Sequence, residues 1–262
     1  MGIDGKVAVV TGSSAGIGKA TVLRLAQRGI KVVVTSRDVE RAAAVVDQIE
    51  ATGGRALAAK FDLLCEEDGD ALVQTTLAAF GRLDYLVNNA FSYETLPPIP
   101  IQELSADQMV QGITTNVTRT LVLTGRCHSA LKETRGRVLT IGSVVVNRAM
   151  LGIPLYSIAK GALTEMTKVL AAEWAQDGIT VNQINPGVVW SDAHKSIGIP
   201  EEQVPLVYDY YSQFHPLGRV GKPDDVAELA TSILLADSDW MTGAVVDLDG
   251  GYSRQGIPLP GA

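Results

Sequence analysis

Three residues near the middle of the chain have the types and the spacing of a proton-transfer site: Ser143, Tyr156 and Lys160. If the segment from Tyr156 onward is helical, residues four positions apart lie on one face, so the phenol and the ammonium point the same way. A neighbouring cation favours the phenolate and lowers a tyrosine pKa from its ordinary value of about 10. Such a tyrosine suits general acid and base catalysis, with the Ser143 hydroxyl holding the reacting oxygen. An isolated pair at this spacing is usually a solvated helix face, so the rest of the chain must support the interpretation.

The composition limits the classes of function. The 262 residues are 46% hydrophobic and 19% charged, which is typical of a soluble globular protein. The net charge of −7 and the lack of any Lys or Arg run argue against nucleic acid as a partner and favour a small-molecule substrate. Cys65 and Cys127 lie far apart without metal-ligand spacing, so we expect no disulfide framework and no metal site. Without a signal-peptide pattern or an apolar stretch of about 20 residues, we expect a cytoplasmic protein that does not interact with a membrane.

Short apolar segments rich in branched residues alternate with longer segments of helical periodicity. Strands are expected at residues 6–11, 31–35, 56–61, 85–88, 137–141, 180–184 and 244–248. Helices are expected at residues 17–28, 39–51, 67–80, 106–131, 157–176 and 223–235. Continuously apolar strands are buried on both faces, which indicates a parallel sheet covered by helices on each side. We therefore predict an α/β protein with a Rossmann-like, doubly wound, seven-stranded parallel sheet, in a single domain over residues 1–262.

Two segments interrupt this alternation. Residues 92–101 are rich in proline, and residues 190–221 form a long connection that contains three tyrosines and a phenylalanine. In an open sheet of this kind, ligands bind beyond the carboxyl ends of the strands, where both segments would lie. Both segments are therefore expected beside a ligand site.

A glycine-rich loop, Thr11 to Gly18, directly follows the first expected strand and reads T-G-x-x-x-G-x-G. Its glycines, Gly12, Gly16 and Gly18, let the backbone turn sharply and approach an anion, which the following helix N-terminus stabilises. The loop has no P-loop lysine, so it indicates a bound pyrophosphate rather than nucleotide hydrolysis.

The second expected strand leads into Ser36 and Arg37, where the adenosine ribose of a dinucleotide would lie. An acidic residue there commonly accepts hydrogen bonds from the ribose of NAD, whereas an arginine accommodates the 2′-phosphate of NADP. Arg37 therefore favours NADP(H) over NAD(H). The alternative is a surface contact between Arg37 and Asp38.

The motifs follow one another in an order that resembles the short-chain dehydrogenase/reductase family over essentially the whole chain. They are Gly12, Gly16 and Gly18, then Asn88-Asn89-Ala90, Asn116, Ser143, Tyr156, Lys160 and Pro186-Gly187. The resemblance implies that Tyr156 is the general acid and base and that Ser143 polarises the substrate oxygen. It further implies that Lys160 lowers the Tyr156 pKa and binds the nicotinamide ribose, and that Asn116 anchors a water linked to Lys160.

The resemblance also implies a set of cofactor-binding residues, with Asp62 against the adenine, Ser191 in the place of a common threonine, and Asn89 in a structural role. The set is Gly12, Ser14, Gly16, Ile17, Gly18, Ser36, Arg37, Asp62, Leu63, Asn88, Ala90, Tyr156, Lys160, Pro186, Gly187, Val189 and Ser191.

The chain departs from the family at Phe91, where a glycine usually follows Asn-Asn-Ala. Either the ring forms a wall of the substrate pocket, which we favour, or it packs in the core and the local backbone is altered. The family also implies that residues 190–221 form a lid over the substrate and that the protein is a homotetramer or homodimer. An apolar stripe on the expected helix at 157–176 is consistent with an interface, or it covers the sheet; its members are Ala162, Leu163, Met166, Leu170 and Trp174.

These features predict an oxidoreductase that transfers a hydride between NADP(H) and a small carbonyl or secondary-alcohol substrate, in the direction of ketone reduction. One alternative is an NAD-dependent alcohol or sugar dehydrogenase on the same scaffold. A more distant alternative is a nucleotide-sensing protein without turnover, which has no need of Ser143, Tyr156, Lys160 and Asn116 together.

Overall fold

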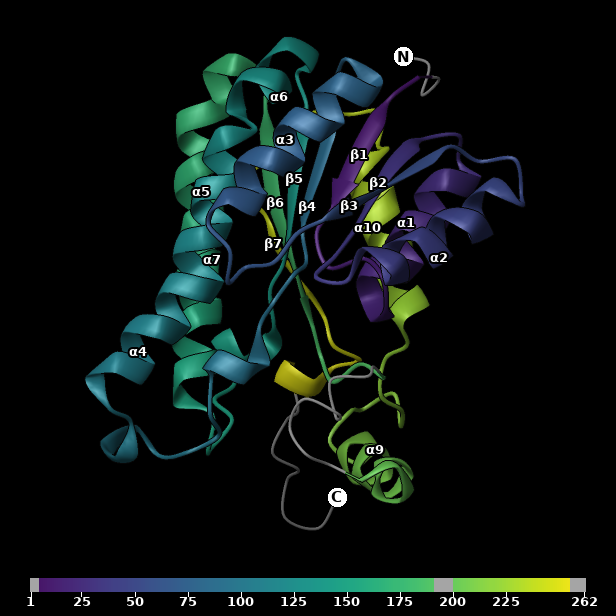
Figure 1. Cartoon of the computed structure of the whole chain (residues 1–262). Helices are drawn as coiled ribbons and strands as arrows, with labels where there is room; N and C mark the ends of the chain where they lie inside the picture. Colours follow the sequence, from purple (N-terminus) through teal and green to yellow (C-terminus); the bar gives the residue numbers. More distant parts are fainter. Residues whose placement is uncertain (1–4, 191–199, 255–262) are drawn as a thin grey trace.

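A computed structural model of the chain describes residues 5–190 and 200–254 (Figure 1). Seven parallel strands form one sheet in the order β3-β2-β1-β4-β5-β6-β7, which confirms the predicted architecture. The strands are β1 (Val7–Val10), β2 (Lys31–Ser36), β3 (Ala56–Lys60), β4 (Tyr85–Asn88), β5 (Arg137–Ile141), β6 (Thr180–Pro186) and β7 (Val245–Leu248). The order reverses between β1 and β4, and this switch point opens a crevice at the carboxyl ends of the strands.

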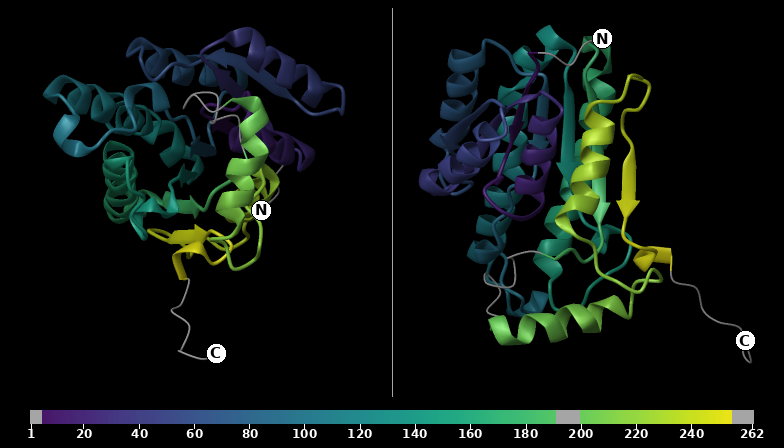
Figure 2. Two further views of the ribbon diagram at one scale, coloured as in Figure 1. Left: turned by 90° about the horizontal axis from the view of Figure 1, so that it is seen from below. Right: turned by 90° about the vertical axis from the view of Figure 1, so that its right-hand side faces the viewer.

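Helices cover both faces of the sheet (Figures 1 and 2). The helices are α1 (Gly16–Gln27), α2 (Val39–Glu50), α3 (Glu67–Phe80), α4 (Ala106–Ile113), α5 (Arg119–Arg126), α6 (His128–Thr134), α7 (Pro154–Trp174), α9 (Val204–Ser212) and α10 (Pro223–Leu234). Helices α1, α2 and α10 lie on one face and α3, α5 and α7 on the other (Figure 1). Helix α9 lies beyond the carboxyl ends of the strands (Figure 2).

The strands divide their side chains between two hydrophobic cores, because successive residues of a strand point to opposite faces. Ala8 and Val10 of β1 pack against α1, α2 and α10, whereas Val9 packs in the core that contains Leu72 of α3 and Leu123 of α5. Burial on both faces explains why β1 and β2 are almost continuously apolar, whereas β6 also buries the polar side chains of Asn182, Gln183 and Asn185. No described helix is both long and apolar enough to cross a membrane.

The prediction of one continuous helix at 106–131 is wrong. Helix α4 ends at Ile113, a π-helical turn follows at Thr114–Thr118, and α5 and α6 continue the path. The side chain of Asn116 turns inward from this wider turn and donates to the carbonyl oxygen of Gly112 at 3.2 Å. Hydrophobic periodicity does not register one extra residue in a turn, so the break was not visible in the pattern.

The apolar stripe on α7 covers the sheet. Leu163, Met166, Leu170 and Trp174 are all buried in the core beside α3 and α5. The alternative interpretation of this stripe is therefore correct, and the four residues do not form a surface for a second copy. The exposed apolar side chains of α7 are Ile158 and Val169 instead.

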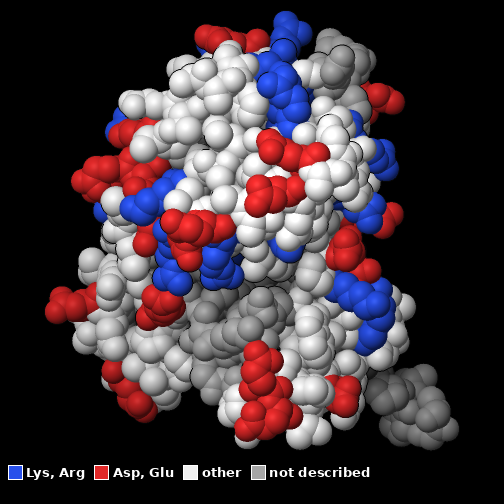
Figure 3. All heavy atoms as spheres, turned by 45° about the vertical axis from the view of Figure 1, so that its right-hand side comes forward, with Lys and Arg blue, Asp and Glu red and all other residues white. Residues whose placement is uncertain are grey.

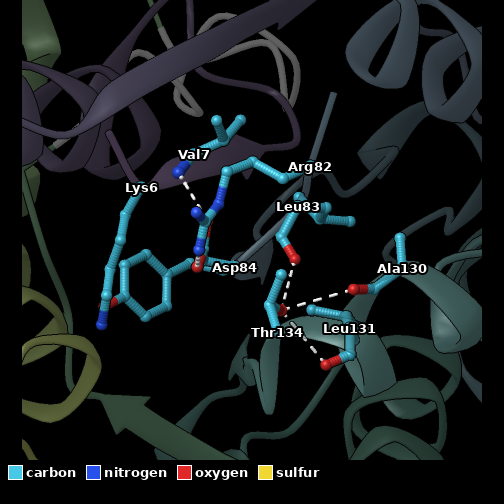
Figure 4. A network of polar contacts seen from close by, with 9 residues as sticks. Lys6, Val7, Arg82, Leu83, Asp84, Ala130, Leu131 and Thr134 are labelled. Carbon is cyan, nitrogen blue, oxygen red and sulfur yellow. Dashed lines mark hydrogen bonds and ion pairs between the residues drawn. The ribbon is translucent and has the colours of Figure 1, made fainter. Parts of the chain in front are cut away.

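The buried carboxylate of Asp84 links the amino ends of β1 and β4 (Figure 4). These ends lie opposite the crevice, which is at the carboxyl ends of the strands. The Asp84 carboxylate accepts from the Val7 backbone at 2.9 Å and from two guanidinium nitrogens of Arg82 at 2.8 and 2.6 Å. Its side chain is only 3% exposed. Removal of one partner leaves buried polar groups without compensation, which is costly.

We expect Asp84→Ala to lower the free energy of unfolding by about 2–4 kcal/mol, measured as a lower urea midpoint at unchanged m value. The control is Asp70→Ala, which breaks the Asp70–Arg126 pair, where both side chains are more than half exposed. That loss should stay below about 1 kcal/mol. Equal losses in the two variants would contradict the structural role of Asp84.

Candidate active site

The glycine loop turns from β1 into α1 through conformations that require glycine. Gly12 and Gly16 have φ of 62° and 53°, in the left-handed region. A Cβ on Gly12 would lie 3.0 Å from the Ala90 backbone, and a Cβ on Gly18 would lie 2.5 Å from the Gly12 carbonyl oxygen. The loop thus packs closely against the end of β4, and α1 packs closely against the loop.

The end of β4 holds this loop in place by hydrogen bonds. The Asn89 amide donates to the carbonyl oxygens of Thr11 and Gly12 at 2.8 and 3.0 Å. The Thr11 hydroxyl accepts from the backbone nitrogens of Asn89 and Ala90, both at 2.9 Å. Asn89 therefore has the structural role expected for it.

The N-terminus of α1 can receive an anion. Its N-cap residue, Ala15, has no side-chain oxygen to bind the first amides of the helix, and the first turn contains no acidic residue. Those amides and the helix dipole are oriented toward a cavity of about 650 Å³ that Gly12, Ala15, Gly16 and Ile17 line. These features fit the pyrophosphate of a dinucleotide.

The other end of the same cavity is lined by Ser143, Tyr156 and Lys160, so the structure brings the three residues together. Ser143 follows β5, and its backbone nitrogen donates to the Asn185 side chain at 3.2 Å. Tyr156 and Lys160 lie one turn apart near the start of α7, as the spacing predicted. The Ser143 side chain acts on Tyr156 as a hydrogen-bonding group and lowers its pKa.

Lys160 is almost completely buried, at 4% exposure. Its ammonium nitrogen donates to the Ile141 carbonyl oxygen at 2.9 Å and lies 3.9 Å from the centre of the Phe91 ring. Because burial disfavours the charged form, the pKa of Lys160 falls to about 7.

The pKa of Tyr156 is raised, not lowered as the sequence suggested. Burial is the main cause, and hydrogen bonds from Ser143 and Tyr93 oppose it in part. Burial also lowers the pKa of Lys160, so the lysine places less positive charge beside the phenol than the pattern implied.

Comparison with known proteins agrees with this geometry. Residues 12–253 match a family described as enoyl-(acyl carrier protein) reductase. The chain is 38% identical over 252 residues to an uncharacterized oxidoreductase of Methylorubrum extorquens, covering 95% of this chain and 98% of the other. It is 36% identical over 260 residues to a hydroxy(phenyl)methylsuccinyl-CoA dehydrogenase subunit, BbsD, of Thauera aromatica, covering 97% and 98%.

A short-chain type dehydrogenase/reductase from Mycobacterium marinum has the same fold, with a TM-score of 0.86, 26% identity and 97% coverage of each chain. The chain belongs to the short-chain dehydrogenase/reductase family. It is an oxidoreductase that acts on alcohol or carbonyl groups, and the family implies a nicotinamide dinucleotide cofactor.

Nine of the predicted site residues line the cavity, and the others do not. Those that line it are Gly12, Gly16, Ile17, Ser143, Tyr156, Lys160, Pro186, Gly187 and Val189. Those that do not are Ser14, Gly18, Ser36, Arg37, Asp62, Leu63, Asn88, Ala90 and Asn116. Ser191 lies outside the described residues, and the cofactor roles of all these positions stay predictions.

Asp62 and Leu63 follow β3 and do not line this cavity. The Asp62 carboxylate accepts from the Leu64 backbone at 2.9 Å, and Leu63 is buried in the core. Asn88 donates from its side chain to the Thr124 hydroxyl at 2.9 Å.

Asn116 holds the loop that follows β4. Its side-chain oxygen accepts from the Ser92 backbone at 2.7 Å, and its amide donates to the Thr95 hydroxyl at 2.9 Å. The water position that the family implies for Asn116 stays a prediction, but the side chain itself fixes the turn that contains Tyr93.

Phe91 lines the cavity, as the preferred interpretation expected, and it also packs against the core. Its ring meets Tyr156 edge to face at 5.3 Å between centroids and Tyr93 at 5.6 Å. Within the described residues, Arg135 is the only non-glycine residue with positive φ, so Phe91 does not strain its backbone.

Sequence reasoning missed five residues that line this cavity: Ala15, Ile141 and Gly142, and two with polar side chains, Tyr93 and Arg41. Tyr93 lies in the proline-rich segment that interrupts the strand and helix alternation, which was its only signal. Arg41 lies one helical turn beyond Arg37, in the first turns of α2. Figure 3 shows basic and acidic side chains interspersed over one face of the molecule, so a single arginine does not stand out by charge.

Proposed function

We propose that the protein transfers a hydride between NADP(H) and a carbonyl or secondary-alcohol substrate, and that it reduces a ketone. One observation carries this proposal: the anion-binding end of α1 and the cluster of Ser143, Tyr156 and Lys160 open into the same cavity. A bound dinucleotide could thus extend from its pyrophosphate to the proton donor.

When bound, the nicotinamide ring supplies or accepts the hydride. The chain contributes the proton and the position. Tyr156 protonates the substrate oxygen during reduction, while the Ser143 hydroxyl donates to the same oxygen and stabilises its developing negative charge. Lys160 lies one helical turn after Tyr156 and would bind the ribose hydroxyls with its ammonium. Pro186, Gly187 and Val189 line the cavity near these groups and would border the nicotinamide.

The test is a direct assay of NADPH oxidation against a panel of aryl, alkyl and cyclic ketones, with the corresponding alcohols and both oxidised cofactors for the reverse reaction. Turnover of ketones with NADPH supports the proposal. Tight cofactor binding without any turnover across the panel would contradict it and favour a nucleotide-sensing role.

The cavity walls favour a substrate with an apolar or aromatic group beside its carbonyl. Phe91 and Tyr93 form an aromatic wall next to Tyr156. The rings of Trp190 and Tyr208 stack at 4.1 Å, so α9 contacts the segment that follows β6. This contact supports the predicted lid at residues 190–221, of which residues 191–199 lie outside the described part of the chain. The phenyl group in the name of the Thauera aromatica relative agrees with this class.

The preference for NADP(H) rests on Arg37, which the structure pairs with Glu94. Their charged groups lie 3.0 Å apart, with both side chains about half exposed. The alternative contact with Asp38 is not formed, because the Asp38 carboxylate caps α2 through the Glu40 backbone at 3.0 Å. An exposed ion pair is weak, so a 2′-phosphate can displace Glu94 from Arg37.

We expect Arg37→Ala to weaken NADPH binding by about 10- to 100-fold and NADH binding by less than about threefold, measured by nicotinamide fluorescence. Glu94→Gln is the matched control, since it breaks the same ion pair but keeps the arginine; its NADPH affinity should not fall. Arg41→Ala tests the second arginine at the cavity. An unchanged NADPH/NADH ratio in Arg37→Ala would favour the second candidate, an NAD-dependent dehydrogenase, which the pairing of Arg37 with Glu94 supports.

A homotetramer or homodimer in the cytoplasm completes the proposal. Exposed apolar side chains on neighbouring helices support self-association; they are Val110 of α4, Leu121 and Val122 of α5, and Ile158 and Val169 of α7. Both cysteines are free, which agrees with a reducing compartment. Light scattering of the purified protein measures the number of subunits.

A further inference from the structure

A second tyrosine lies against Tyr156. We propose that Tyr93 is a positioning residue, whose hydroxyl donates a hydrogen bond to the Tyr156 oxygen and stabilises the phenolate that forms during proton transfer. This inference rests on the proposed function, because it assigns a role in the same proton transfer.

The two rings are held in a fixed arrangement. Tyr93 and Tyr156 stack with 5.8 Å between centroids and 14° between planes. Phe91 meets both of them edge to face, and its own face is covered by the Lys160 ammonium. Each ring therefore restricts the others, and the two tyrosines are close enough for each side chain to change the pKa of the other.

The backbone that contains Tyr93 is also fixed. Tyr93 begins a short 3-10 turn, Tyr93–Thr95, and Asn116 binds both flanks of this turn, at the Ser92 backbone and at the Thr95 hydroxyl. The Asn116 side chain is fully buried in the π-helical turn. The π-helical turn thus holds the segment that contains Tyr93 in place through the hydrogen bonds of Asn116.

The electrostatics set which tyrosine ionises. The pKa of Tyr93 is raised well above its ordinary value, first by the negative charge on Tyr156, then by burial and by the hydrogen bond to Tyr156. The raised pKa favours the protonated Tyr93 hydroxyl, which can donate to the Tyr156 oxygen. The hydrogen bond from Tyr93 acts in the opposite direction on Tyr156 and lowers its pKa.

The pair and the titratable groups beside it come from three parts of the chain. Lys160 lies on the same helix as Tyr156, Tyr93 lies after β4, and Tyr208 approaches Tyr93 from α9. With the pKa of Lys160 near 7, hydrogen-bond donors have a larger share in stabilising the phenolate above that pH. Those donors are the Ser143 and Tyr93 hydroxyls.

The test is Tyr93→Phe, which keeps the ring and its stacking and removes the hydroxyl alone. Alcohol oxidation needs the phenolate, so its rate rises with pH through the apparent pKa of Tyr156. Loss of a donor to the phenolate raises that pKa. We expect the acidic limb of the kcat profile to move up by roughly 0.5–1 pH unit and kcat below the limb to fall about three- to tenfold, with cofactor affinity unchanged.

A second measurement does not depend on turnover. Ultraviolet difference titration detects tyrosinate directly, and subtraction of the Tyr156→Phe spectrum isolates the ionisation of Tyr156. The tyrosinate signal should shift upward in Tyr93→Phe by the same amount as the rate profile. This shift is measurable even if no substrate is turned over, so failure of the proposed function is distinguished from failure of this inference.

Tyr85→Phe is the control, because it removes another buried tyrosine hydroxyl, one that accepts from Lys6 at 2.9 Å at the other end of the sheet. Its rate profile and titration should match the wild type. An unmoved Tyr156 titration in Tyr93→Phe would overturn the inference. So would a fall in kcat at all pH values without a shift of the limb, since that result indicates a merely structural role.

Discussion

Replacement of Tyr156 by phenylalanine is expected to lower kcat by about 10²- to 10⁴-fold, the range that positioned general acids and bases contribute. The phenylalanine ring can keep the edge-to-face contact with Phe91 and the stack with Tyr93. Only the proton donor and its hydrogen bonds to Ser143 and Tyr93 are lost. Cofactor affinity, measured by nicotinamide fluorescence, should stay within about threefold of the wild type, because the ammonium of Lys160 and the glycine loop are intact.

The Tyr85→Phe variant again serves as the control and should keep full activity, since its hydroxyl bonds Lys6 far from the cavity. Full activity in Tyr156→Phe would refute the assignment of the general acid. A large loss of cofactor affinity together with activity would mean that the variant distorts the site, and the assignment would then lose its support from this experiment.

The parts of the site that sequence predicted are those in which spacing along one element sets the geometry. Tyr156 and Lys160 share a helix face because they are four residues apart, and both line the cavity. The glycine loop was predictable because its backbone tolerates no side chain at Gly12 or Gly18. The central strands β1, β2 and β4 were predictable because burial on both faces leaves them mostly apolar.

The parts that sequence did not predict depend on contacts between distant segments. Asn116 binds residues 21 and 24 positions away, and Arg37 binds Glu94 57 positions away. The rise in the Tyr156 pKa is of this kind too, because it comes from burial by the surrounding segments, which also lowers the pKa of Lys160. Tyr93 contributes through its packing on Tyr156, for which its own sequence neighbours give no sign.

Lys160→Met is expected to make the protein less active but more stable. Loss of the amine removes a group that would bind the cofactor ribose and assist Tyr156, so kcat/KM should fall by about 10²-fold or more. Burial of the lysine opposes folding, because the unfolded chain keeps it charged in water while the folded chain lowers its pKa from 10.5 to about 7. That difference corresponds to about 3–5 kcal/mol at neutral pH. In the variant the Ile141 carbonyl oxygen loses its hydrogen-bond donor, which lowers the free energy of unfolding by about 1–3 kcal/mol and offsets part of this gain.

The change of this stability difference with pH gives a sharper test than its size at one pH. Between pH 7 and 10.5 the unfolded state binds more protons at Lys160 than the folded state, so wild-type stability rises with pH in this window relative to the variant. We expect the variant to exceed the wild type by about 1–3 kcal/mol at pH 7 and this advantage to disappear toward pH 10.5, measured by urea unfolding across the range. Lys168→Met is the control on the same helix, where the lysine is half exposed and pairs with Glu165 at 2.6 Å, and it should show no such trend. A wild type that is more stable than Lys160→Met at pH 7, with a gap independent of pH, would mean that Lys160 is charged in the folded protein, and Tyr156 would then titrate beside a cation as the sequence pattern first indicated.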